Sequence, residues 1–129
     1  MNTPHTPTGV APPFGHYCHA MQLPADAERL VISGQVGVMP DGTLGADIGQ
    51  QAEWAWRNIV TILREASMDI TNIVKYTTYL IRAQHVAAAR NARNKALGDH
   101  RAASTLVVIS ALADPAWLIE IEAEAAISR

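Results

Sequence analysis

Two segments near the end of the chain decide the fold: Leu106-Val107-Val108-Ile109 and Ile119-Glu120-Ile121-Glu122-Ala123-Glu124. The first is an unbroken apolar run, which is typical of a β-strand that is buried on both faces. The second alternates, so that its apolar residues share one face and its three glutamates share the other. Because an unpaired carboxylate is costly to bury, the acidic face must meet water or a polar cleft. We therefore expect two strands within residues 103–126, joined by a turn at Ala113-Asp114-Pro115, in a sheet that is covered by something beyond its own chain.

The size and composition indicate one domain that associates with copies of itself. The chain has 129 residues, of which 49% are hydrophobic and 17% are charged. A chain of this length makes a single domain with a real core, and the apolar content exceeds what such a domain needs alone, which indicates an oligomer interface. The net charge of −2 provides no basic field for nucleic acid or an anionic membrane.

The same features favour a cytoplasmic protein. The single cysteine, Cys18, excludes a disulfide within the chain and fits a reducing compartment. The first residues lack the basic start and apolar stretch of a secretory signal. No apolar segment approaches the roughly 18–20 residues that span a bilayer. We therefore expect no membrane association.

The first half of the chain predicts a flexible lead-in, two strands and a long helix. Residues 1–13 contain four prolines, so the domain proper is expected over residues 14–129. Strands are predicted at 16–23 and 29–38, and Gly34 within the second indicates a bulge or a close approach. After a turn at residues 40–42, Asp47 and Gln50 can form a capping box. An apolar helical stripe follows at Ala52, Ala55, Trp56, Ile59, Val60 and Leu63.

The second half adds a strand at 73–82, a helix at 85–97 that Gly98 closes, and the two strands described first. The order is β-β-α-β-α-β-β, which indicates an α+β fold. Two helices can cover one face of such a sheet only. We therefore expect the other face to pack against copies of the chain, with clefts between subunits.

In this order of elements and in several segments, the sequence resembles the Rid family, the reactive intermediate deaminases also called L-PSP or YjgF-type proteins. The resemblance runs from about Tyr17 to Ile127. It rests on an ordered set of segments rather than on one motif, namely Tyr17, Ser33-Gly34-Gln35, Pro40-Asp41-Gly42, residues 51–59, residues 73–80 and residues 119–123.

The resemblance implies a chorismate-mutase-like fold with two helices on one face of a mixed sheet, and a homotrimer with a barrel-like core and three intersubunit clefts. In deaminating members, an arginine near the start of the penultimate strand binds the carboxylate of an imino or enamino acid, and a glutamate orients the attacking water. The glutamate corresponds to Glu120. Tyr17, Ser33 and Gly34 correspond to cleft residues. No metal or organic cofactor is implied.

The arginine position is where this chain departs from the family pattern. Counting back from Leu112 places Ser104 there, beside Thr105. Arg101 lies three residues upstream, and an odd offset directs a side chain to the opposite face of a regular strand. Either Arg101 reaches the cleft through a shifted register, or Ser104 and Thr105 form a neutral pocket.

Each candidate residue also has a purely structural interpretation. Glu120 can be one of three solvated glutamates, and Tyr17 can be a packing aromatic. Ser33 can be a buried serine bonded within its own strand. Cys18 is expected to be a buried thiol rather than a nucleophile. With His16 it supplies two ligands on one strand face, fewer than a zinc site needs, so no metal site is expected.

The sequence and the resemblance leave three functions open. The first is a hydrolase that deaminates a small imine or enamine to a carbonyl compound and ammonia. The second is a trimer that binds a small metabolite without catalysis. The third is an endoribonuclease or translation inhibitor, which some family names suggest. The basic cluster of Arg90, Arg93, Lys95, His100 and Arg101 lacks stacking aromatics. A solvated helix face or pairing between subunits explains it better, and nucleic acid is not expected as a partner.

Overall fold

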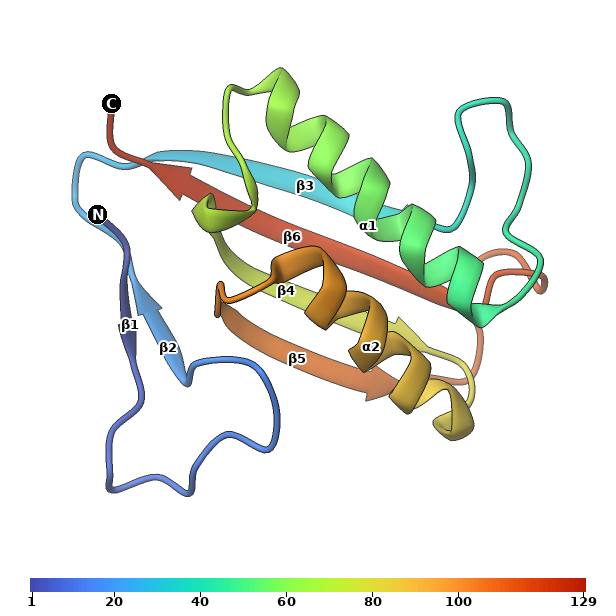
Figure 1. Ribbon diagram of the computed structural model, residues 1–129, viewed down its shortest axis with the longest axis horizontal. Coiled ribbons are helices and arrows are strands. Elements are labelled where there is room, and N and C mark those ends of the chain that lie inside the picture. Colours follow the sequence, from blue (N-terminus) through green and yellow to red (C-terminus); the bar gives the residue numbers. More distant parts are fainter.

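Two helices lie across one face of a four-stranded sheet in the computed structural model, which describes residues 1–129 (Figure 1). The helices are α1 (Ile48–Glu65) and α2 (Val86–Leu97), with short 3₁₀ turns η1 (Ile70–Asn72) and η2 (Ala83–His85). The strands of the sheet are β3 (Glu28–Val36), β4 (Ile73–Leu80), β5 (Ala103–Val108) and β6 (Ile119–Ile127). This arrangement confirms the predicted α+β fold with both helices on one face of a mixed sheet. Neither helix has the length and apolarity that crossing a bilayer demands.

The strand order is β3-β6-β4-β5, and β4 separates the two strands that we expected to be neighbours. β6 is antiparallel to both β3 and β4, whereas β5 is parallel to β4. The parallel pair follows from α2, because a crossover helix returns the chain to its starting edge before the next strand. The expected turn at residues 113–115 is therefore part of a longer connection, residues 109–118, that carries the chain past β4.

A single chain does not bury Leu106-Val107-Val108-Ile109 on both faces, so the expected cover from beyond the chain stays a prediction. β5 is an edge strand, and Val107 and Val108 are 37% and 47% exposed. The apolar run therefore leaves open surface on the isolated chain.

The N-terminal segment forms a second, two-stranded sheet. β1 (Thr3–His5) pairs antiparallel with β2 (Ala20–Gln22), so the proline-containing lead-in holds a paired strand. The strand expected at 16–23 is shorter than predicted, and Tyr17 lies in the preceding loop. Cys18 forms an isolated parallel bridge with Ala103, which attaches this loop to the start of β5.

Helix α1 begins and packs as its sequence predicts. The Asp47 carboxylate accepts a hydrogen bond from the Gln50 backbone N–H at 2.8 Å. The Gln50 side chain accepts one from the Ala46 N–H at 3.0 Å, one residue before the expected capping-box partner. The predicted stripe faces the sheet, and its fully buried members are Ala52, Ala55, Trp56, Ile59 and Leu63.

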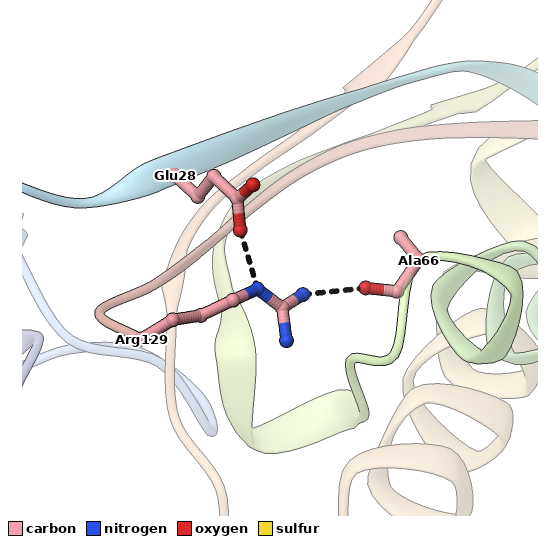
Figure 2. Close-up of polar contacts among 3 residues, drawn as sticks. All are labelled: Glu28, Ala66 and Arg129. Atoms are coloured by element: carbon pink, nitrogen blue, oxygen red, sulfur yellow. Dashed lines mark hydrogen bonds and ion pairs between the residues drawn. The ribbon is translucent and has the colours of Figure 1, made fainter.

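The last residue of the chain joins three parts of the fold at the surface (Figure 2). The Arg129 guanidinium donates to the Glu28 carboxylate at the start of β3. It also donates to the Ala66 carbonyl at the end of α1, at 2.6 Å. Both charged side chains are largely exposed, so we expect a contribution of at most about 1 kcal/mol.

A buried amide connects α1 to the segment that enters β6. Gln51 is 2% exposed, and its Nε2 donates to the carbonyls of Gly45 at 3.1 Å and Ala116 at 3.3 Å. Its Oε1 accepts from the Leu118 N–H at 2.8 Å. A Cβ at Gly37 would lie only 2.3 Å from the Gln51 Cα, so a glycine is needed there. The amide thus fixes the loop before α1 and the loop before β6.

Replacing this amide is predicted to destabilise the fold. Gln51→Ala leaves the buried Gly45 carbonyl, the Ala116 carbonyl and the Leu118 N–H without this partner, which should lower the free energy of unfolding by about 2–4 kcal/mol. The matched control is Gln50→Ala, since Gln50 is the neighbouring glutamine but is exposed, and we expect a loss below about 1 kcal/mol. Urea unfolding followed by circular dichroism measures both. Equal losses for the two variants would contradict the role given to Gln51.

Candidate functional site

The Glu120 carboxylate lies against the backbone of β3 at a bulge. The register between β3 and β6 shifts between Ile32 and Gln35, so that Ser33 and Gly34 together stand opposite Glu122. A Cβ on Gly34 would lie 2.0 Å from Oε2 of Glu120. As placed, the carboxylate occupies the space that a Cβ at Gly34 would take, which confirms the bulge and the close approach predicted from Gly34. Ser33 is exposed and its hydroxyl has no hydrogen-bond partner in the chain. The interpretation of Ser33 as a buried serine bonded within its own strand is therefore wrong.

The three glutamates of β6 lie on the sheet face that the helices leave open, but they differ in their partners. Glu122 accepts a hydrogen bond from the Tyr79 hydroxyl at 2.7 Å, and Glu124 pairs with Arg29 at 3.0 Å. Glu120 is half-buried and its carboxylate has no hydrogen-bond or ion-pair partner within the chain. Glu120 is thus the one carboxylate of this face that is free to bind something else.

Around these glutamates the open face is polar and slightly hollow. The hydrogen bond from Tyr79 to Glu122 raises the pKa of the tyrosine, and partial burial lowers the pKa of Lys75. The Lys75 ammonium donates to the Thr105 hydroxyl at 2.7 Å. A hollow of about 270 Å³ lies here, and its lining comes from β3, β4 and β6: Val31, Ile32, Lys75, Thr77, Glu122, Ala123 and Glu124.

The other predicted residues lie at the start of β5. The Tyr17 hydroxyl accepts a hydrogen bond from the Phe14 N–H at 3.1 Å, and the ring is half-buried. Arg101 is exposed just before the strand, and its Nε donates to Nδ1 of His16 at 3.2 Å. Arg101 therefore contacts the loop before β2 rather than Glu120. Ser104 stands opposite Tyr76 and faces the helices, whereas Thr105 stands opposite Thr77 and faces the open side.

A single chain does not bring Glu120 close to the predicted residues at the start of β5. Glu120 stands opposite Tyr79, whereas Ser104 stands opposite Tyr76, three residues away along β4. At about 3.3 Å per residue and 4.8 Å per strand, Glu120 and Ser104 are separated by roughly 10 Å along the strands and 10 Å across them. Figure 1 shows the same separation, since β6 begins at the end of the sheet where β5 finishes. A site that uses both groups must combine two copies of the chain.

Cys18 has the properties of a structural thiol. It is 3% exposed, and burial raises its pKa. A thiol must ionise to act as a nucleophile, so this environment works against that role. The expectation of a buried thiol is confirmed.

The sequence interpretation missed the burial of Arg93. We expected it on a solvated basic face, yet it is only 8% exposed. The spacing contained the signal, because Ala89, Arg93 and Leu97 follow one another at four-residue intervals and all three are buried. A larger hollow of about 800 Å³ between α1 and α2 is lined by residues such as Trp54, Arg57 and Lys95, and by none of the predicted site residues.

Comparison with known proteins identifies the family and supports the fold. The family model described as Endoribonuclease L-PSP matches residues 8–127. The chain is 30% identical to protein HMF1 of Saccharomyces cerevisiae over 97 residues, covering 74% of this chain and 73% of the yeast protein.

Two solved structures extend the similarity to nearly the whole fold. The Rid protein YyfB of Yersinia pestis, described as of unknown function, has a TM-score of 0.86, 30% identity and 98% coverage of both chains. RidA of an Antarctic Psychrobacter has a TM-score of 0.74 and 26% identity, covering 89% of this chain and 91% of its own. The chain therefore belongs to the Rid family of L-PSP and YjgF-type proteins.

Proposed function

We propose that the protein is a Rid-like hydrolase that converts a small reactive imine or enamine into a carbonyl compound and ammonia, in clefts between the subunits of a cytoplasmic homotrimer. One observation carries the proposal. The Glu120 carboxylate lies over the Gly34 backbone, half-buried and without a partner in its own chain. A carboxylate in this state is available to hold a water molecule in a fixed direction.

The chemistry needs only water and proton transfers. With the imine protonated on nitrogen, Glu120 accepts a proton from water as the oxygen bonds to the carbon of the C=N group, and the nitrogen becomes a neutral amine. Glu120 returns that proton to the nitrogen, then accepts the proton of the new hydroxyl as the C–N bond breaks, so that ammonia leaves and the carbonyl forms. Tyr17 and Ser33 shape the cleft around the substrate, with Tyr17 supplied by the neighbouring copy. Holding substrate and water together in this way is itself a large part of such catalysis.

Assembly is supported by what the open face leaves uncovered. Val31 is 71% exposed on β3, beside the paired Glu124, and Val107 is exposed at the β5 edge. Together with the separation of Glu120 from Tyr17, these exposed side chains favour contacts with another copy of the same face.

The trimer is tested by its mass. Light scattering should give close to three times the chain mass of 13.9 kDa. Val31→Asp places a charge on the open face and should shift the mass toward one chain. Val10→Asp is the control, because Val10 is 50% exposed but lies outside the sheet, and its mass should stay unchanged. A wild-type protein that is monomeric at micromolar concentration would rule out intersubunit sites.

The catalytic role of Glu120 is tested by ammonia release from a freshly generated imine. Glu120→Gln keeps the shape but cannot take a proton, so we expect kcat to fall by about 10²- to 10⁴-fold. Glu124→Gln is the matched control on the same strand face, since Glu124 is already paired with Arg29, and kcat should change by less than about threefold. Full activity in Glu120→Gln would refute the mechanism.

A metabolite-binding trimer without catalysis is the second candidate, and the start of β5 favours it. Ser104 occupies the position of the family's arginine, and the Thr105 hydroxyl already accepts a hydrogen bond from Lys75. In that case ligands would bind saturably and no imine would be hydrolysed by the wild type. RNA binding is less well supported, because Arg93 is buried and the basic residues of α2 do not form one exposed stripe.

A further inference from the structure

The side chain of Arg93 is a buried cation with no counterion in the chain. It is 8% exposed, and its Nε donates to Oδ1 of the adjacent Asn94 at 3.2 Å. Neither terminal nitrogen of the guanidinium has a hydrogen-bond partner. The two ion pairs of the chain, Arg29 with Glu124 and Arg129 with Glu28, lie elsewhere. The terminal nitrogens are not among the fully enclosed atoms of the chain, so a mostly buried guanidinium keeps its unpaired end accessible to an anion from outside the chain.

The guanidinium lies beside the loop that carries Tyr17. A Cβ built on Gly15 would lie 3.4 Å from Nη2 and 3.7 Å from Nη1 of Arg93, and 3.8 Å from Cε1 of Tyr17. Gly15 therefore stands between the two unpaired nitrogens and the tyrosine ring. Since Tyr17 is the residue proposed to line the cleft, Arg93 is placed at the same corner of the molecule.

A second unpaired donor lies in this loop. Nδ1 of His16 accepts a hydrogen bond from Arg101, so it carries no proton, and the proton of the neutral ring is on Nε2. His16 Nε2 is fully enclosed and has no partner. No carboxylate is bonded to Arg93, His16 or Arg101. Buried donors are nearly always satisfied in folded proteins, so the enclosed Nε2 of His16, next in the chain to the Gly15 that Arg93 contacts, indicates a missing acceptor.

We propose that Arg93 binds the anionic group of the ligand, an oxyanion of the carboxylate or phosphate type, at the Tyr17 corner of the site. The proposal rests on the proposed function and deepens it, because it names the charge of the substrate and the residue that selects it. The two terminal nitrogens of a guanidinium match two oxygens of an oxyanion. Helix α2 then supplies the positive charge, and Ser104 and Thr105 on β5 need not.

Direct binding tests the inference without relying on turnover. Calorimetric titration of the wild type with pyruvate and with inorganic phosphate separates the two oxyanions, and neutral acetone should not bind detectably. Arg93→Gln should weaken the binding of whichever of the two oxyanions binds the wild type more tightly by about 10- to 100-fold, as expected for loss of a charge-assisted contact. Arg90→Gln is the control, because Arg90 is exposed on the same helix, and binding should stay within twofold.

A second variant controls for the possibility that Arg93→Gln lowers binding by misfolding. Arg93→Lys keeps the charge and most of the stem but cannot form two parallel hydrogen bonds. It should keep the far-ultraviolet spectrum and melting behaviour of the wild type, while binding the oxyanion several-fold more weakly. Unchanged oxyanion affinity in both Arg93→Gln and Arg93→Lys would overturn the inference.

Kinetics and mass distinguish the remaining outcomes. Arg93→Gln should raise KM for the imine of pyruvate and leave KM for the imine of acetone unchanged.

If the wild type hydrolyses no imine but binds an oxyanion through Arg93, the proposed function fails and this inference stands. If imines are hydrolysed and Arg93→Gln alters neither KM, the inference fails and the function stands. If Arg93→Gln instead dissociates the trimer at unchanged oxyanion affinity, the anion is a glutamate of the neighbouring copy and the inference is overturned.

Discussion

The buried amide of Gln51 is the interaction on which the position of Glu120 depends. It reaches from the first turn of α1 to the carbonyl of Ala116 and the N–H of Leu118, two residues before Glu120. Its backbone packs against Gly37, which follows β3, and its side chain also holds the Gly45 carbonyl. All of its polar atoms have partners, so the amide is a fixed point rather than an unsatisfied group. The helix layer thereby sets where β6 begins and where its first glutamate points.

The fold places its chemical groups at opposite ends of one sheet. The end that holds Glu120 has a carboxylate without a partner, and the end that holds Tyr17 and Arg93 has donors without acceptors. Strands of this length keep the two ends apart within one chain, so a site that uses both ends needs a second copy. Association and chemistry are therefore coupled in the proposed function. The exposed valines of β3 and β5 provide the apolar contact, and the polar groups between them provide the site.

The sequence predicted elements whose signals are local. The cap at Asp47 and the stripe after it located α1, the alternation located β6, and Gly34 in mid-strand located the bulge. Pairing was not predictable in the same way. Periodicity tells which face a residue takes but not which strand lies beside it, so the insertion of β4 between β5 and β6 was missed.

The candidate site likewise contains features that local sequence patterns predict and features that depend on tertiary contacts. Glu120 and Gly34 were predictable because an acidic face and a missing side chain leave local marks. The contact of Arg101 with His16 and the enclosure of Arg93 depend on how the N-terminal loop crosses the chain, which no local pattern records. At Arg93 two local signals also conflicted, since its charge favoured exposure and its spacing from Ala89 and Leu97 favoured burial.

The isolated bridge between Cys18 and Ala103 has a consequence for oxidative damage. It draws the sulfur under the start of β5, where burial keeps it in the thiol form. Peroxides and electrophiles react with thiolates, so this position is shielded from sulfenic acid formation and alkylation. The loop that carries Tyr17 is thus anchored beside a thiol whose burial disfavours its oxidation.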